Sequence, residues 1–136
     1  SKKTEGDQCT PIGVFKIGKV YYRPDRIKKI DTILKTKKIK KNMGWCDDVK
    51  SPKFYNKLMN IRSNIRHEKL YRKDYKYDLL IPLQYNTKKR VIGKGSCIFI
   101  HLTKNYSPTL GCIGLKKKDF FVLLKIINKK TKIKIE

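Results

Sequence analysis

The sequence is poor in acidic residues, in histidine and in long apolar runs, and each shortage argues against a particular kind of site or segment. Its 136 residues include 11 Asp and Glu, two His and a single Trp. The four cysteines show no C-x-x-C spacing and the histidines no H-x-x-x-H spacing, so no zinc site is predicted. No apolar run of about 18 residues occurs, so no membrane-spanning helix is predicted either.

The shortage of acid leaves a strongly basic chain, with 35 Lys and Arg and a formal net charge of +24. Such a charge invites a nucleic-acid interpretation. However, lysine outnumbers arginine and is scattered in short runs (37–41, 116–118, 129–130), as in a genome rich in A and T. No arginine fork or docking motif appears, so specific nucleic-acid binding is not expected. A polyanionic cell envelope would attract the same surface.

Residues 96–102 are apolar and rich in β-branched or aromatic side chains, which predicts a buried strand. Because side chains alternate along a strand, Cys97 and His101 would share one face with Phe99, and Ile98 and Ile100 the other. The length of the chain suits one domain with a modest core.

A histidine at the end of this strand and a cysteine eleven residues later suit nucleophilic catalysis. A thiolate attacks where a thiol scarcely does, so a working Cys112 needs a base, and His101 is the nearest candidate. The loop at 103–109 could return Cys112 to the imidazole, and a backbone amide beside Gly111 could stabilise an oxyanion. The alternative is that Cys112 and His101 are ordinary core residues, and spacing alone does not decide.

Several motifs, in order, resemble the L,D-transpeptidase family of the YkuD type, especially its small branch. The match is strongest at G-S-C-I-F-I-H (95–101) and P-T-L-G-C-I (108–113). Further matching segments are E-G-D (5–7), T-P-I-G-V-F (10–15), G-W-C-D-D (44–48), Y-N (55–56), E-K-L (68–70) and Y-D (77–78). The resemblance spans nearly the whole chain, residues 1–136, as a single catalytic domain. It implies a mainly β fold, a YkuD-like β-sandwich or open barrel with a short C-terminal helix.

The resemblance also implies a mechanism. Cys112 would attack the carbonyl of the L-centre in an L,D peptide bond of a peptidoglycan stem peptide, giving a thioester that an amine resolves. His101 matches the general base, which this family orients by a main-chain carbonyl. Thr109 and Gly111 match the turn that forms the oxyanion site, and no metal or organic cofactor is implied. Leu110 and Gly114 depart from the best-known motif, which leaves the acceptor open.

Two alternatives to the transferase remain. Water in place of the amine would make the chain a carboxypeptidase or a crosslink hydrolase. If the domain has no catalytic activity, it would instead be a module that binds the cell wall or a polyanion. Since the chain starts at Ser1, inside a family motif, we expect upstream residues, including any signal segment, to be missing. The implied location is the bacterial envelope, in the periplasm, and no oligomeric state is predicted.

Candidate substrate-binding residues lie mostly in the polar segment 42–66, which the resemblance suggests is a substrate-facing lid. They are Trp45, Asp47, Asp48, Tyr55, Asn56 and Arg72. The two acids could bind stem-peptide amines or fix the loop, and Tyr55 and Asn56 could contact substrate or merely hold it. Trp45 is more typical of a hydrophobic core residue than of a platform that binds sugar. Arg72 could grip a carboxylate or be a solvated charge.

Local patterns predict the remaining elements. Strands are expected at 13–22, at 77–85 with Pro82 at an edge or bulge, and at 132–135. Residues 26–41 fit either an amphipathic helix or, by resemblance, a strand and loop. Short helices are expected at 66–71 and after Asp119, the second with Phe120, Leu123, Leu124 and Ile127 buried. Cys9 and Cys97 are interpreted as small buried residues, and a Cys9–Cys46 disulfide is left open.

Overall fold

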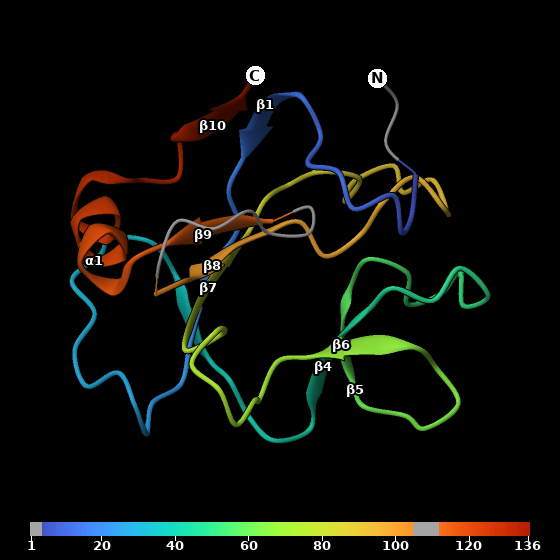
Figure 1. Ribbon diagram of the computed structural model, residues 1–136, viewed down its shortest axis with the longest axis horizontal. Helices are drawn as coiled ribbons and strands as arrows, with labels where there is room; N and C mark the ends of the chain where they lie inside the picture. Colours follow the sequence, from blue (N-terminus) through green and yellow to red (C-terminus); the bar gives the residue numbers. More distant parts are fainter. Residues whose placement is uncertain (1–3, 105–111) are drawn as a thin grey trace.

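The computed structural model describes residues 4–104 and 112–136, in which ten short strands precede or follow a single helix (Figure 1). The elements are β1 (Gly13–Lys16), β2 (Val20–Tyr22), β3 (Thr36–Lys38), β4 (Met43–Cys46), β5 (Leu58–Asn60), β6 (His67–Lys69), β7 (Leu79–Pro82), β8 (Phe99–Leu102), β9 (Ile113–Leu115), α1 (Lys117–Ile126) and β10 (Lys132–Ile135). The protein is therefore mainly β with a short C-terminal helix, which confirms the predicted fold class. No helix in the described part is long and apolar enough to cross a membrane.

The strands form three sheets. The largest has the order β3-β2-β7-β8-β9, with β2–β3 and β8–β9 parallel and the other neighbours antiparallel. A second sheet has the order β5-β4-β6 and is antiparallel. The third pairs β1 with β10 antiparallel, which joins the first strand of the chain to the last.

The central strands β7 and β8 are buried along their whole length, as expected for strands covered on both faces. Ile98, Ile100 and Leu102 enter one core cluster with Phe120 of α1. Phe99 enters a second cluster, on the side of the β5-β4-β6 sheet, together with Trp45 and Leu80. The predicted alternation of faces is thus confirmed, and β8 separates two cores. The strand itself is shorter than the predicted 96–102, because Cys97 has a left-handed backbone and regular pairing starts at Phe99.

The C-terminal elements agree with the sequence patterns except at the start of the helix. The strand at 132–135 is confirmed, and the helix buries Phe120 and Leu124 as predicted. The helix was expected to follow Asp119, but it begins at Lys117: Lys116 precedes it without a side-chain cap, and Asp119 lies in the first turn. A carboxylate in the first turn interacts favourably with the positive, N-terminal end of the helix dipole.

Several other local predictions need correction. The 66–71 segment is not helical, because residues 67–69 pair with β4 as strand β6. The polar segment 42–66 is not one loop, because it supplies β4 and β5. Pro82 is not on an edge strand: β7 lies between β2 and β8, and Pro82 ends it. The strand predicted at 13–22 is interrupted, since Ile17 makes only an isolated bridge to Leu83.

Residues 26–41 form an extended segment with β3 at 36–38, as the family resemblance predicted, and contain no helix. Ile27, Ile30 and Leu34 reach the first core cluster from this segment. Ile33 remains 81% exposed. The helical spacing of these side chains was misleading because an extended chain that follows the core can also reach it at intervals of three or four residues.

Candidate active site

His101 lies in β8 and is buried, with 2% of its surface exposed. Its Nδ1 is 2.9 Å from the carbonyl oxygen of Leu102. A carbonyl can only accept, so Nδ1 carries the ring hydrogen and Nε2 holds the free lone pair. Nε2 is buried and has no hydrogen-bond partner among the described residues. The structure therefore presents a neutral imidazole with its basic nitrogen unoccupied.

The electrostatic surroundings of His101 favour the neutral form. Burial lowers the pKa of the imidazole from its usual 6.5, and the positive charges of Lys76 and Arg72 lower it further. The hydrogen bond to Leu102 raises it in part. A base must be unprotonated to accept a proton, so the net downward shift keeps His101 ready at neutral pH.

Cys112 directly precedes β9, which runs parallel to β8 with His101 beside Gly114. Continuing that register by one residue sets Cys112 beside Phe99, two positions from His101. Phe99 and Cys112 belong to the same core cluster, on one face of the sheet. Aligned residues of parallel strands point to the same face, so Cys112 and His101 are diagonal neighbours there. The predicted pair is brought onto one surface.

The thiol of Cys112 is half-buried and donates a hydrogen bond to the carbonyl oxygen of Cys97, at 3.1 Å. Cys97 adopts a left-handed backbone with φ of 56°, which turns the chain at the start of β8. This turn directs the Cys97 carbonyl at Cys112. Gly111 and Thr109, the other predicted members of the catalytic turn, lie outside the described residues.

A cavity of about 340 Å³ opens beside the Cys112 thiol. Its lining residues are Glu5, Gly6, Gln8, Asp47, Arg66, Glu68, Lys76, Tyr77, Ser96, Cys97, Ile98 and Cys112. A second cavity, of about 820 Å³, shares Glu5, Asp47 and Arg66 with it and extends past Asp48 to His67. The two together make a polar groove that leads away from the thiol.

Tyr77 is a site residue to which the sequence assigned no role. Its ring makes an edge contact with the imidazole of His101, with 6.0 Å between centroids, and its hydroxyl donates to Glu68 at 3.0 Å. Burial, followed by the charges of Glu68 and Cys112, raises the pKa of this phenol, so it stays protonated. The Y-D motif was the only sequence signal for it.

Glu5 was also missed. Its Oε1 accepts hydrogen bonds from the hydroxyls of Tyr55 and Ser96, both at 2.6 Å. Glu5 thereby ties the N-terminal segment to the residues just before β8, at the wall of the cavity. The E-G-D motif marked this position, but the partner Ser96 lies 91 residues away in sequence.

Among the predicted substrate-binding residues, Asp47 alone lines the cavity beside Cys112. Its Oδ1 is buried and has no hydrogen-bond partner within the described structure, and its Oδ2 lies 3.5 Å from Arg66 Nε. Burial raises the pKa of this carboxyl, although Arg66 opposes the shift. Asp48 differs, because it accepts from the backbone amides of Lys50 and Arg66 and so fixes the loop.

Trp45, Tyr55 and Asn56 are buried, and their polar groups bond inside the protein. Trp45 Nε1 donates to Asn56 Oδ1 at 2.9 Å, and Asn56 Nδ2 donates to two backbone carbonyls, of Tyr85 and Asn86. Tyr55 accepts from the amide of Gly95 as well as donating to Glu5. This geometry favours the alternatives left open for these residues, a core role for Trp45 and a loop-holding role for the other two.

Arg72 makes two hydrogen bonds to Asp74, at 2.9 and 2.7 Å, and a longer one to Glu68 at 3.3 Å. Its guanidinium is thus largely engaged by neighbouring carboxylates. It does not line the cavity beside Cys112. A role in gripping a substrate carboxylate stays a prediction.

The other cysteines are reduced. Cys46 is buried, Cys9 is exposed and Cys97 is half-buried, and none is in a disulfide. The Cys9–Cys46 bridge is therefore absent, and Cys9 is not the buried residue predicted from the sequence. Over residues 4–104 and 112–136, no group of three or more His, Cys, Asp or Glu side chains could hold a metal ion.

Comparison with known proteins gives one match. The family model YkuD, described as the L,D-transpeptidase catalytic domain, matches residues 1–135. Neither the curated proteins nor the solved structures give a significant match.

Proposed function

Since the chain belongs to the YkuD family of L,D-transpeptidase catalytic domains, we propose that it is a cysteine acyltransferase acting on peptidoglycan stem peptides, with Cys112 as nucleophile and His101 as general base. The observation that supports this most is the state of His101. The Leu102 carbonyl fixes the ring hydrogen on Nδ1, which leaves a buried Nε2, without a partner among the described residues, on the sheet face that carries Cys112.

In the proposed first half-reaction, His101 Nε2 takes the proton of the Cys112 thiol. The thiolate then attacks the carbonyl carbon at the L-centre of the stem peptide. As the tetrahedral intermediate collapses, the C–N bond breaks, the terminal D-alanine leaves, and its nitrogen takes the proton from the imidazolium. The product is a thioester between Cys112 and the shortened stem.

In the second half-reaction an amine attacks the thioester carbonyl and gives up a proton to His101. The C–S bond breaks, and the thiolate recovers that proton. Backbone amides of Gly111 and Cys112 are the proposed oxyanion donors, as the family motif implies. The cell envelope, in the periplasm, is the proposed location, because the family acts on cell-wall peptides.

The proposed substrate site is the groove formed by the two cavities beside Cys112. Its wall carries the carboxylates of Asp47, Glu68 and Glu5. Asp47 Oδ1, which has no protein partner in the described structure, is suited to accept a hydrogen bond from a stem-peptide ammonium or amide. A stem peptide combines amines with carboxylates, and Arg66 and Lys76 on the same wall suit the latter.

The test is intact mass spectrometry after incubation with a carbapenem and, separately, with a disaccharide tetrapeptide. We expect a stoichiometric adduct on the wild type and on Cys9→Ala, and none on Cys112→Ala. The Cys9 variant is the matched control because that thiol is exposed and does not itself line the cavity, although its neighbour Gln8 does. An adduct that persists in Cys112→Ala, or none on the wild type, would contradict the proposal and favour a silent binding module.

A hydrolase with water as acceptor would give the same adduct, so the products separate the two reactions. Chromatography of a reaction with tetrapeptide and a D-amino acid is expected to show an exchanged product. Release of tripeptide alone would contradict transfer and establish the carboxypeptidase alternative.

A further inference from the structure

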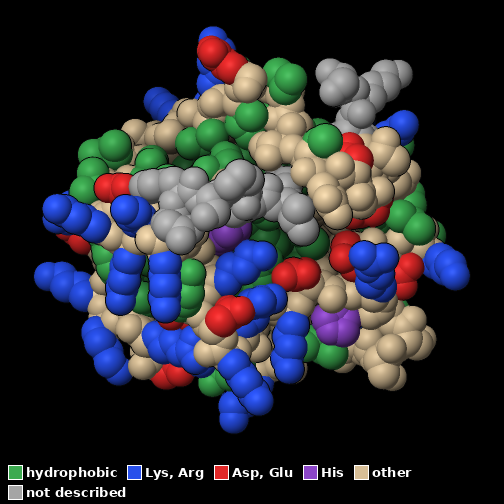
Figure 2. Space-filling model, in the orientation of Figure 1, with side chains coloured by type: hydrophobic (Ala, Val, Ile, Leu, Met, Phe, Trp, Pro, Cys, Tyr) green, Lys and Arg blue, Asp and Glu red, His purple; other side chains and the backbone are tan. Residues whose placement is uncertain are grey.

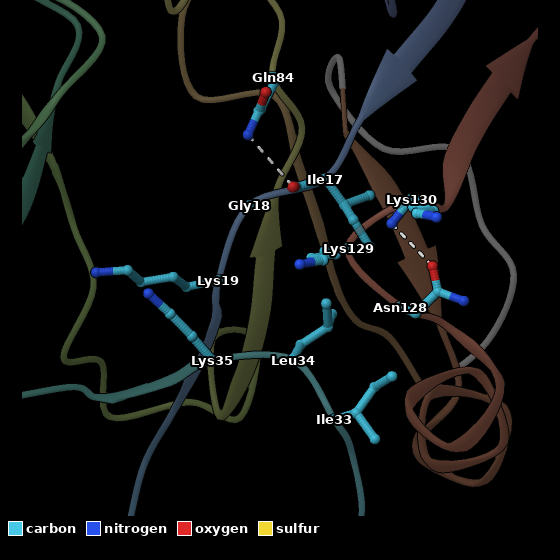
Figure 3. Close-up of a pocket in the computed structure, with 10 residues that line it drawn as sticks. All are labelled: Ile17, Gly18, Lys19, Ile33, Leu34, Lys35, Gln84, Asn128, Lys129 and Lys130. Carbon is cyan, nitrogen blue, oxygen red and sulfur yellow. Dashed lines mark hydrogen bonds between the residues drawn. The ribbon is translucent and has the colours of Figure 1, made fainter.

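A third cavity, of about 670 Å³, shares no lining residue with the groove beside Cys112. Figure 3 shows its lining, which is Ile17, Gly18, Lys19, Ile33, Leu34, Lys35, Gln84, Asn128, Lys129 and Lys130. Four of these ten residues are lysines and none is acidic. Lys19 and Lys35 lie side by side, because the amide of Val20 donates to the carbonyl of Lys35 at 3.0 Å.

Large apolar side chains stand exposed at this cavity and on helix α1, which ends near it. Ile33 lines it and is 81% exposed, and in Figure 3 it lies next to α1. Val122 and Ile126 of α1 are 54% and 71% exposed. Four residues apart on a helix, they share one face, opposite the buried Phe120 and Leu124. The helix ends two residues before Asn128, at the cavity wall.

An outward helix face normally carries polar residues, so this arrangement calls for a partner. Helix α1 adds further lysines: Lys125 directly precedes Ile126, and Lys118 lies one turn before Val122, while Asp119 is the acidic residue of this helix. Exposed apolar tips within a ring of lysines suit a lipid surface: lysines meet anionic headgroups, while aliphatic chains enter the boundary with the acyl region. A soluble polyanion would use the lysines and leave the isoleucines in water.

We propose that this lysine-rimmed surface, formed by Lys19, Ile33, Lys35, Val122, Ile126, Lys129 and Lys130, docks the protein on an anionic phospholipid bilayer. The proposal does not depend on the chemistry at Cys112. Because the surface and the groove share no lining residue, the groove is not part of the docking contact.

Net charge alone would also draw the protein to anionic vesicles, since Lys and Arg spread over much of the molecular face in Figure 2. The test therefore compares two quadruple variants of equal charge. One replaces Lys19, Lys35, Lys129 and Lys130 by Gln. The control replaces Lys40, Lys57, Lys69 and Lys94 by Gln, all exposed and absent from this cavity. Circular dichroism verifies that both are folded.

Sedimentation with phosphatidylcholine vesicles, with and without phosphatidylglycerol, measures the partition coefficient. We expect binding only to the anionic vesicles, a loss of about 100-fold in the first variant and of less than about tenfold in the control. Equal losses, or no binding of the wild type, would overturn the proposal.

A second pair of substitutions tests the apolar part. Ile33→Ser with Ile126→Ser removes two exposed side chains, so the fold is expected to persist. We expect a further loss of about tenfold that survives added salt. If this variant binds the anionic vesicles like the wild type while the lysine variant does not, the contact is purely electrostatic, and the proposed entry of the apolar side chains into the bilayer is wrong.

Discussion

The carbonyl oxygen of Leu102 fixes the ring of His101, the residue directly before it, by a contact of 2.9 Å to Nδ1. A backbone group thus does the work that a carboxylate does in many catalytic triads. A carbonyl orients the ring without adding a full negative charge, so it does not hold the imidazole in its protonated form. The pH dependence of the site follows from this difference.

The rate of Cys112 acylation is expected to retain its full value to a lower pH than a histidine with an ordinary pKa would allow. Burial lowers the pKa of His101 below 6.5, so the neutral base persists in acid. The measurement is the rate of carbapenem adduct formation between pH 4.5 and 8. An acidic limb centred above 6.5 would contradict the neutral-base geometry.

The same shift makes stability depend on pH. Because the pKa of His101 is lower in the folded state, the unfolded chain binds more protons as the pH falls below 6.5. The free energy of unfolding is therefore expected to decrease from pH 7 towards pH 5. Urea titrations of His101→Gln should show a shallower decrease than the wild type, since Gln does not titrate. Equal slopes would show that His101 is not held neutral by burial.

Asp47→Asn is expected to weaken substrate binding without weakening the fold. Burial already disfavours the Asp47 carboxylate, and the ion pair with the exposed Arg66 stabilises little. We expect KM for a stem tetrapeptide to rise about tenfold, kcat to change less than about twofold, and Tm to hold. An unchanged KM would mean that no substrate group meets Asp47 Oδ1.

Asp48→Asn is the neighbouring comparison, because Asp48 accepts two backbone hydrogen bonds within its loop. Its substitution is expected to lower Tm and to leave KM of the folded fraction unchanged. If both variants behave alike, the assigned difference between the two acids is wrong.

Asn56→Ala is expected to lower the free energy of unfolding by about 3 kcal/mol. The substitution leaves the buried Trp45 indole N–H and the carbonyls of Tyr85 and Asn86 without the hydrogen bonds that Asn56 makes to them. Chemical denaturation measures the loss. KM of the folded fraction should be unchanged if Asn56 only holds the loop. A raised KM with little loss of stability would restore the substrate-binding role.

The sequence predicted best those elements whose buried side chains recur with the period of the element. The alternation from Cys97 to Leu102 and the stripe of Phe120 and Leu124 report burial directly, since each pattern has the period of its own element. Strands β4 and β6 were missed because each is four residues or fewer and gains its stability from pairing with distant segments.

The sequence proposed His101 and Cys112 as a pair through the family motifs around them, and the structure places both on one face of the sheet, while their catalytic role stays a prediction. Tyr77 and Glu5 gave no such signal. Their place in the site depends on contacts with His101 and Ser96, which only the folded chain brings together. Long-range contacts of this kind leave no local pattern to detect.

The pairing of β1 with β10 has a mechanical consequence. Gly13 pairs with Ile135 and Lys16 with Lys132, so the outer ends of the first and last strands lie at the same end of the ladder. A force that separates the two chain ends would load these hydrogen bonds one at a time, as a zipper opens, and not all together in shear. Under tension the small terminal sheet is expected to part first, at low force, and to shield β8 and Cys112 from the pull.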